Sequence, residues 1–549
     1  NKVIPTWLSE HGYLLKKEHI NHSYPLCWRC KTPTLFRATS QWFASIDGFR
    51  KEAMDQIENH IEFIPSWGRE RIGNMIRDRG DWCISRQLWW GHRIPAWYNT
   101  VTGETYVGES DPEDTTNWVQ DEDVLDTWFS SALWPFATLG WPEDTTDLER
   151  YYPTNTMVTG YDIIFFWVAR MAFQARHFTK NRPFKDVLIH GLLRDAQGRK
   201  MSKSLGNGID PMKVIEEYGI DALRFFLTTN STPGQDMRYI PEKVEAAGNF
   251  INKIWNASRF VFMNLPEGMK VEDVDLTHLS LADSWIINRL NETITHVTEN
   301  MEKYEFALVG NELYSFVWDD FCSWYVEMSK TALNGTDEVA KRAAQSTLYV
   351  CLKAIVGLLQ PFMPFVTEEI YDLLPGAKES INLESWPTVI ENVTTCDLTA
   401  MARVISAIQK IREVKIVNDL KPSTLIHIAL KDLDGNTIKA DEAMSAIIMK
   451  LAKAQWQDTL EGDLTVEAIQ GGSLYIPSSE LSNPEEEIKK LEAEIERLKS
   501  EIARSTGILS NQGFIAKAPA AKIENEKQKL EAYQKQYAVI EERLNVLKK

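Results

Sequence analysis

The chain of 549 residues carries a formal net charge of −18 and contains 44% hydrophobic and 25% charged residues. Its length predicts about three to five domains, and its composition is typical of a globular protein rather than a disordered or fibrous one. The acidic balance excludes a protein that attracts nucleic acid through its bulk charge, so any nucleic-acid contact must use local basic surfaces.

The cysteines and the lack of a recognisable targeting segment indicate the compartment in which we expect the protein. Of the six cysteines, only Cys27 and Cys30 are close in sequence, which is no disulfide framework and predicts a reducing, cytoplasmic compartment. No stretch reads as a signal peptide, and the apolar stretch 354–366 is too short to span a bilayer, so we expect no membrane association. The chain begins at Asn1 in mid-pattern, and we expect it to be truncated at its N-terminus.

Residues 1–82 mix short helical and strand-like stretches and contain a CxxC pair. Cys27 and Cys30 have the spacing of half a zinc site. The other cysteines are scattered and do not complete the site: Cys83, Cys322, Cys351 and Cys396. A Zn²⁺ ion at Cys27 and Cys30 is therefore possible on sequence grounds, but these residues alone do not define it.

From residue 83 to residue 228, strand-like runs alternate with helical ones, which predicts a parallel α/β sheet. The apolar stretch 188–193 predicts a buried strand that ends in a turn. Asp210-Pro211 predicts the start of a helix, Gly219 its end, and residues 220–226 the next helix. Ligands of open α/β sheets bind at such strand-to-helix connections.

The stretch Lys200-Met201-Ser202-Lys203-Ser204 lies on that connection. Gly198 precedes it, and Gly206 and Gly208 follow it. Two lysines among small, polar residues predict a mobile loop that can close on a polyanion. A generic lysine pair would more simply be a solvated surface loop.

Two further stretches of this region carry candidate binding residues. In 159–167, Asp162 is a lone carboxylate in an apolar run, and buried carboxylates are rarely kept unless they are paired. The alternative is an aspartate at the end of an element. The stretch 123–131 contains Trp128, and Trp167 ends the stretch 159–167.

The remainder of the chain is predominantly helical before and after a small mixed region. Apolar stripes at helical spacing predict a bundle over about 245–373: one stripe is Ile286, Leu290 and Ile294, and another is Phe321, Tyr325 and Met328. Residues 401–482 mix strands and helices. From residue 483, heptad-spaced apolar residues with a break at 507–519 predict an antiparallel coiled-coil hairpin. This hairpin is either an arm that reaches a partner or a dimerisation element.

These motifs resemble the class I aminoacyl-tRNA synthetases of the valine, isoleucine and leucine group. The lysine stretch resembles the second signature of that class, and from Cys83 onward the stretches 84–98 and 160–167 are similar to the bacterial valine type. Residues 1–82 look more like the isoleucine type, notably 22–30 and 64–68. The resemblance covers nearly the whole chain.

The resemblance implies a ligase that uses ATP with Mg²⁺, valine and a tRNA. It implies that Lys200 and Lys203 act on the triphosphate, and that the ATP site comprises His190, Gly191, Lys200, Met201, Ser202, Lys203 and Ser204. It implies that Asp162 holds the substrate ammonium group, with Thr159 and Gly160 near the ribose or aminoacyl group. In the same way, Trp128, Trp167 and Ile163 would form the side-chain slot, whose limited size discrimination explains why the family has an editing site.

The resemblance also implies a domain order. In chain order, we expect a remnant that follows the editing insertion (1–82), the C-terminal half of a Rossmann-type catalytic domain (83–228), a stem-contact linker (229–280), a helical anticodon-binding domain (281–400), a small mixed α/β region (401–482) and a coiled-coil tRNA-binding arm (483–549). The family's first ATP-contacting signature and most of its editing domain are missing. We therefore expect that this chain alone does not form an aminoacyl-adenylate.

Three alternatives remain open at this point. Residues 1–82 favour an isoleucyl-tRNA ligase of the same class. The bundle and hairpin alone would suit a non-catalytic tRNA-binding module. A dimer held by the hairpin would be a scaffold. The state that we expect is a monomer.

Overall fold

The computed structural model describes residues 3–27, 30–202, 205–391, 393, 397–481, 484–510 and 520–547. The chain divides into two compact units, Asn1–Ile189 and His190–Lys549. Among the described residues, no helix combines the length and apolarity that a membrane span needs.

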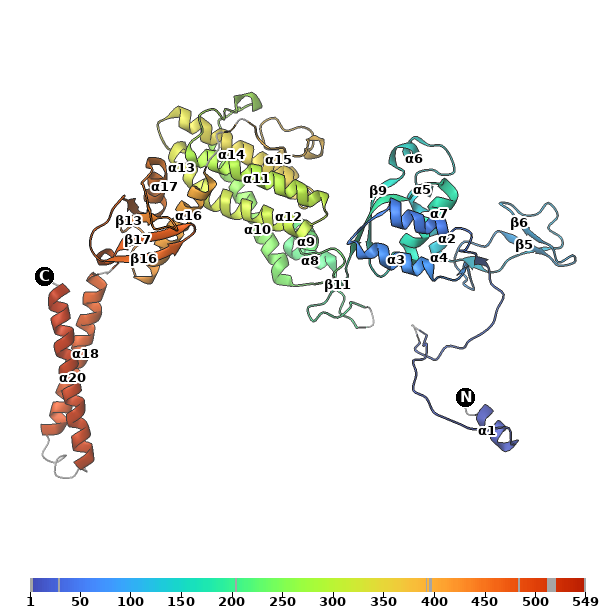
Figure 1. Ribbon diagram of the computed structural model, residues 1–549, viewed down its shortest axis with the longest axis horizontal. Coiled ribbons are helices and arrows are strands. Elements are labelled where there is room, and N and C mark those ends of the chain that lie inside the picture. The colour runs from blue at the N-terminus through green and yellow to red at the C-terminus, as the bar shows by residue number, and fades with distance from the viewer. Residues whose placement is uncertain are drawn as a thin grey trace. The chain divides into compact units, whose positions relative to one another are not determined.

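The first unit contains a three-stranded sheet, of which β9 is labelled in Figure 1. Strand β10 (Phe184–His190) lies between β2 (Glu62–Ile64) and β9 (Thr154–Gly160), and it runs parallel to β2 with Val187 opposite Phe63. Val187, Leu188 and Ile189 are all buried, so both faces of β10 are covered. The predicted buried parallel strand is confirmed in this part of its range.

Helices α3 (Trp67–Arg77) and α7 (Ala169–Thr179) share one hydrophobic core with this sheet. Other helical segments of the unit are α1 (Val3–Glu10), α2 (Arg50–Asp55), η1 (Gln56–His60), α4 (Thr127–Ser131), α5 (Trp134–Ala137), α6 (Thr146–Tyr151) and the π-helical turn η2 (Ile164–Val168). Small sheets ordered β1-β3, β4-β8 and β6-β5-β7 are formed by β1 (Phe43–Ala44), β3 (Trp82–Cys83), β4 (Ser85–Arg86), β5 (Ala96–Asn99), β6 (Thr105–Val107), β7 (Trp118–Gln120) and β8 (Val124–Leu125).

The second unit begins where the predicted strand 188–193 is interrupted. Strand β10 ends at His190, and β11 (Leu193–Arg194) pairs instead in parallel with β12 (Met237–Arg238), so a single strand over 188–193 is wrong. The reason is Gly191, where a Cβ atom would lie 1.8 Å from the carbonyl oxygen of Gln235. Another backbone segment therefore passes directly against the chain at this point.

The helices that follow begin and end as predicted. Asp210 caps α8 (Pro211–Tyr218) by accepting a hydrogen bond from the Met212 amide at 3.0 Å. Gly219, with φ of +89°, separates α8 from α9 (Ile220–Thr229). The left-handed backbone at this residue favours glycine.

A helical bundle forms the largest core of the second unit. Its elements are α10 (Pro241–Asn264), α11 (Leu281–Glu302), α12 (Phe306–Tyr314), the π-helical η4 (Ser315–Tyr325), α13 (Val326–Leu333), α14 (Glu338–Leu359) and α15 (Pro364–Tyr371), with short turns η3 (Val271–Asp273) and η5 (Ile381–Leu383). The two predicted stripes are buried here, which confirms the bundle: Ile286, Leu290, Ile294, Phe321, Tyr325 and Met328.

A five-stranded sheet with two helices follows the bundle. Its strand order is β14-β13-β17-β16, with β15 beside β13. The elements are α16 (Leu398–Val417), β13 (Ile426–Lys431), β14 (Thr437–Ile438), α17 (Glu442–Ala452), β15 (Ala454–Trp456), β16 (Leu464–Ile469), β17 (Gly472–Pro477) and η6 (Ser478–Glu480). The predicted mixed α/β region is confirmed.

Two long helices, α18 (Pro484–Ser510) and α20 (Ala520–Leu547), lie side by side (Figure 1). Leu498 is fully buried in their contact, and the Ser505 hydroxyl lies 2.8 Å from a Glu526 carboxylate oxygen. The predicted break at 507–519 is wrong in its first part, because α18 continues through Gly507 to Ser510; one glycine costs a helix only about 1 kcal/mol. Residues 511–519 and the expected cap Asn483 lie outside the described residues.

Candidate functional site

The candidate ligand-binding residues form two groups, one in each unit. His190, Gly191 and the start of the lysine stretch belong to the second unit, whereas the candidate amino-acid pocket belongs to the first. Lys203 and Ser204 lie outside the described residues. Lys200 is exposed, and Met201 and Ser202 are half-buried.

The lysine stretch follows a tight hairpin formed by residues 194–200. Arg194 and Lys200 face each other as a single antiparallel bridge, and the Asp195 amide donates to the Arg199 carbonyl at 3.1 Å. Gly198, with φ of +81°, forms the turn. The hairpin therefore fixes the backbone on which Lys200 stands.

Asp195 is the acceptor at the centre of this hairpin. Its carboxylate accepts from the Arg199 amide and from Arg199 Nε, both at 2.7 Å, and from Asn207 Nδ2 at 2.9 Å. The hydrogen bond from Asn207, foremost, lowers the pKa of Asp195 to about 2. The carboxylate is thus ionised at neutral pH.

His190 and Gly191 precede the hairpin. The His190 side chain is exposed, and its Nδ1 lies 2.7 Å from the Gly191 carbonyl oxygen. The close passage of Gln235 and Asp236 leaves no room for a side chain at Gly191. A glycine is therefore required by packing against its own chain, a reason separate from approach to adenosine.

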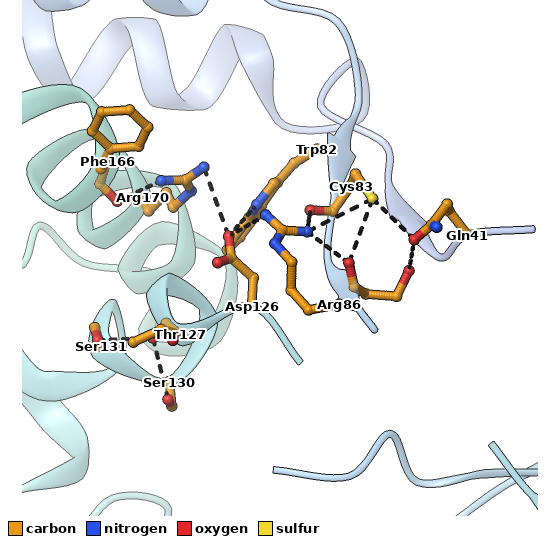
Figure 2. Close-up of polar contacts among 11 residues, drawn as sticks. Gln41, Trp82, Cys83, Arg86, Asp126, Thr127, Ser130, Ser131, Phe166 and Arg170 are labelled. Atoms are coloured by element: carbon orange, nitrogen blue, oxygen red, sulfur yellow. Dashed lines mark hydrogen bonds and ion pairs between the residues drawn. The ribbon is translucent and has the colours of Figure 1, made fainter. Parts of the chain in front are cut away.

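In the first unit, the buried carboxylate of Asp126 lies among polar groups from several segments (Figure 2). Asp126 Oδ2 accepts from Trp82 Nε1 at 3.0 Å and lies 3.1 Å from Arg86 Nη2 and 4.0 Å from Arg170 Nη2. Asp126 directly precedes α4, but its side chain does not cap that helix. It instead connects α4 to α7 and to the segment at residues 82–86.

Arg170 lies almost wholly buried between this carboxylate and aromatic rings. Its guanidinium carbon lies 4.4 Å from the Trp82 ring centroid and 5.6 Å from that of Phe166, within the range of cation–π contacts. Burial lowers the pKa of Arg170 to about 10, and the charge of Asp126 opposes that shift. The Asp126 carboxylate therefore favours the charged form of Arg170 at this buried position.

The two predicted tryptophans lie on helical segments that contact each other. Trp128 is in α4, and Trp167 in η2 donates from Nε1 to the Ser131 carbonyl of α4 at 3.1 Å. The ring stacked on Trp128 belongs to Phe166, with centroids 5.7 Å apart and planes 24° from parallel. Phe166 keeps 43% of its surface exposed, so the aromatic wall is accessible.

The other predicted pocket residues lie at the carboxyl end of β9. Thr159 and Gly160 are buried at the end of the strand, and Ile163 is half-buried just before η2. Asp162 is exposed in the turn between them, so it is an aspartate between two elements rather than a buried one. This edge of the sheet is where open α/β folds bind ligands.

The CxxC pair supplies a turn but not a complete metal site. The Cys27 amide donates to the Thr32 carbonyl at 2.8 Å, and the Lys31 amide donates to the Cys27 carbonyl at 2.9 Å. Among the described residues, no group of three or more His, Cys, Asp or Glu side chains could hold a metal ion. Two thiols are half of a tetrahedral zinc shell, so the described residues do not fit a closed zinc site.

The sequence did not predict the group of contacts around Asp126. No role was predicted for Asp126, Arg86, Phe166 or Arg170. The available signal was a carboxylate two residues before Trp128 and an arginine three residues after Trp167. Asn207, six residues after Met201, was missed in the same way.

Three successive segments of the chain match families of tRNA synthetase domains. Residues 26–240 match the family described as tRNA synthetases class I (I, L, M and V), and residues 283–430 match the anticodon-binding domain of tRNA ligase. Residues 484–548 match the valyl tRNA synthetase tRNA binding arm. A solved Mycobacterium tuberculosis methionyl-tRNA synthetase in complex with methionyl-adenylate shares the fold, with a TM-score of 0.52, 20% identity and coverage of 68% of this chain and 71% of that one.

Relatives with high identity are valine–tRNA ligases. That of Bacillus cereus (strain ATCC 10987 / NRS 248) is 49% identical and covers 100% of this chain, which spans 63% of that protein. That of Lactobacillus johnsonii is 48% identical, with 98% of this chain and 63% of the relative covered. The chain thus spans less than two thirds of the length of these curated relatives.

The isoleucine-like stretch 1–82 led us to expect that the similarity to the valine type is confined to the residues from Cys83 onward. The similarity to valine–tRNA ligases extends beyond those residues. The match to the Bacillus cereus protein includes residues 1–82. Residues 26–240 are thus similar to the class I tRNA synthetases, and the chain over its whole length is similar to valine–tRNA ligases.

Proposed function

We propose that the protein represented by this chain ligates valine to its cognate tRNA in an ATP-dependent reaction. The observation that carries the proposal is 49% identity to a valine–tRNA ligase over the whole chain. The signature stretch at Lys200 supports it, because it follows a hairpin at a strand-to-helix connection. ATP with Mg²⁺, valine and tRNA are the proposed substrates.

The first step joins the valine carboxylate to the α-phosphorus of ATP and releases pyrophosphate. It needs alignment of the reactants and compensation of phosphate charge more than covalent catalysis. We assign phosphate contacts to Lys200 and Lys203, whose compact ammonium groups suit phosphates. The remaining proposed ATP-site residues are His190, Gly191, Met201, Ser202 and Ser204.

We assign recognition of valine to residues at the end of β9 and to the aromatic wall. Asp162 would bind the ammonium group, and its exposure in the turn leaves its carboxylate accessible. Trp128 and Trp167 would border the side chain, with Ile163 beside them, while Thr159 and Gly160 would approach the ribose or aminoacyl group. Phe166 joins this set, because its ring stacks on Trp128.

We propose that the bundle and the two long helices bind the tRNA, the latter as an antiparallel coiled-coil arm. Basic side chains along the arm lie beside acidic ones three or four residues away: Arg497 with Glu494, Lys499 with Glu496, Arg504 with Glu501 and Lys535 with Glu531. Such exposed pairs contribute little to stability, so phosphates can compete for the cations at small cost. We further propose a cytoplasmic monomer with the six-segment domain order given above.

A zinc ion at Cys27 and Cys30 is given no part in this proposal. The expectation that this chain alone does not form the adenylate also remains a prediction. Valine-dependent exchange of pyrophosphate into ATP by the 549-residue chain would contradict it.

Competition binding with purified tRNAs tests the proposed partner. At one fixed salt concentration near physiological strength, the chain should bind the valine tRNA in preference to isoleucine and unrelated tRNAs. Equal binding of all three, or preference for the isoleucine tRNA, would contradict the assignment. A Lys200→Met variant separates the two activities, because it should lose ATP binding while tRNA binding is kept.

A further inference from the structure

We propose that Asp195 and Asn207 form a clamp that holds the backbone on both sides of Lys200 and positions this lysine for a triphosphate. The inference rests on the proposed function for the identity of the ligand. It does not rest on that function for the clamp itself, which is defined by hydrogen bonds among described residues. Both residues act through the loop backbone, so they are positioning residues.

Asp195 supplies the fixed side of the clamp. It lies 6% exposed at the base of the hairpin and accepts from both the amide and the Nε atom of Arg199. Because Arg199 is the residue immediately before Lys200, these bonds fix the chain direction into the lysine. The Gly198 turn, packed beside the guanidinium of Arg238, limits movement of the hairpin tip.

Asn207 spans the loop from its other side. Its Nδ2 donates to Asp195 at 2.9 Å and to the Lys200 carbonyl at 3.3 Å, and its Oδ1 accepts from the Ser202 amide at 3.0 Å. One side chain thus contacts the residue before Met201 and the residue after it. Only a primary amide has a donor and an acceptor placed to make all these bonds.

A clamp on the backbone around Lys200 would favour binding of a triphosphate by reducing the loss of conformational entropy. A lysine on a freely moving loop would lose conformational entropy on binding, which weakens the affinity for ATP. A backbone held before the ligand arrives avoids that loss. The hydrogen bonds to Asp195 are charge-assisted and therefore stronger than bonds between neutral groups.

The pair can be tested by reversal. Asn207→Asp replaces the amide that now donates to Asp195 with a second carboxylate. The carboxylates of residues 195 and 207 should then repel each other. In the double variant Asp195→Asn/Asn207→Asp, the amide and carboxylate exchange places, and a donor again faces an acceptor. Asn256→Asp is the matched control, because it makes the same charge change at an exposed residue of α10 whose amide contacts only the Asn252 carbonyl among the hydrogen bonds observed.

Two readouts are needed on the full 549-residue chain. The first is the rate of trypsin cleavage after Arg199 and Lys200, identified by mass spectrometry, which reports loop order without any ligand. The second is the dissociation constant for ATP with Mg²⁺ from calorimetric titration. Asn207→Asp should raise the cleavage rate and weaken ATP binding, each about tenfold or more, as expected for the loss of a hydrogen bond to a charged group. The reversed pair should recover only the part of both losses that comes from the contact between residues 195 and 207, because an aspartate at 207 still cannot donate to the Lys200 carbonyl. Asn256→Asp should change neither.

The outcomes separate the clamp from the ligand. Normal cleavage and normal ATP affinity in Asn207→Asp would overturn the proposal, as would faster cleavage with unchanged ATP affinity, which would leave a purely structural hairpin. If Asn207→Asp does not fold, Asn207→Ala tests the same bonds without added charge. Failure of the unsubstituted chain to bind ATP would contradict the positioning role, while the cleavage rates would still report whether the clamp exists. The competition binding of tRNAs tests the proposed function separately.

Discussion

We predict that the buried carboxylate of Asp126 contributes measurably to the stability of the first unit. Its Oδ2 atom accepts from Trp82 and lies close to Arg86 and Arg170, and its side chain is only 7% exposed. Asp126→Asn keeps the shape and one acceptor oxygen but removes the charge. Arg170, whose side chain is 5% exposed, would then be a buried cation without its carboxylate.

The expected loss can be bounded from these contacts. Breaking a buried ion pair by removing one partner costs about 3–5 kcal/mol. The long Arg170 contact and the 37% exposure of Arg86 reduce that figure, and the asparagine oxygen can still accept from Trp82. We therefore expect the free energy of unfolding of the first unit to fall by about 2–4 kcal/mol. For a unit of this size, that corresponds to a fall in Tm of about 5–15 °C.

Hydrogen exchange of peptides from the first unit, measured against urea concentration, isolates this loss from the second unit. Asp111→Asn is the control, because Asp111 is exposed in a loop and loses the same charge. The double variant Asp126→Asn/Arg170→Met should be more stable than the sum of the single losses predicts, since it removes the orphaned cation. Equal losses in Asp126→Asn and Asp111→Asn, or strict additivity in the double variant, would refute the reasoning.

Three further predictions concern other buried or perturbed groups. Lys415→Met should lower the free energy of unfolding of the second unit by about 2–4 kcal/mol in urea denaturation, because it strands carbonyls that the buried Nζ now contacts, at Pro422, Thr424, Ala452 and Lys453. Burial raises the pKa of Tyr152 to about 12, whereas a tyrosine in the unfolded chain has a pKa of about 10, so the unfolded chain ionises first as the pH rises. Stability measured in thermal melts should therefore fall between pH 10 and 12, and it should fall less in Tyr152→Phe. The hydrogen bond with the Thr32 hydroxyl, foremost, lowers the pKa of Cys30 to about 7, so iodoacetamide at pH 7 should label Cys30 well before buried Cys322, whose pKa burial raises to about 12; equal labelling in peptide mass spectra would contradict this.

Local signals in the sequence were sufficient for α8, for α9 and for the bundle. Asp210-Pro211 and Gly219 bound α8 because a cap, a proline and a left-handed glycine act within a few residues of the helix they delimit. The stripes of the bundle were readable for a similar reason, since a buried helix face repeats at fixed spacing. Both signals are local and need no knowledge of the tertiary structure.

Contacts distant in sequence explain what was missed in the pocket. Asp126 meets Trp82 and Arg170, each 44 residues away, and nothing in the local sequence identifies these partners. The choice of Phe166 as the ring stacked on Trp128 depends on the π-helical turn η2. A π-helical turn adds a residue to the helical turn, so the side chains beyond it rotate away from the positions that a period of 3.6 predicts.

The same physical device holds both groups of candidate ligand residues. Each unit has a buried aspartate, Asp126 in the first and Asp195 in the second. Its carboxylate contacts several donors from the segments near the candidate binding side chains. An apolar contact tolerates sliding, whereas an ionised carboxylate that accepts directed hydrogen bonds loses free energy as soon as its donors turn away. Directed bonds therefore fix backbone positions more tightly than burial alone. Because such an aspartate lies just before its motif, two residues before Trp128 and five before Lys200, its role can be suspected from sequence, although its partners emerge only from the fold.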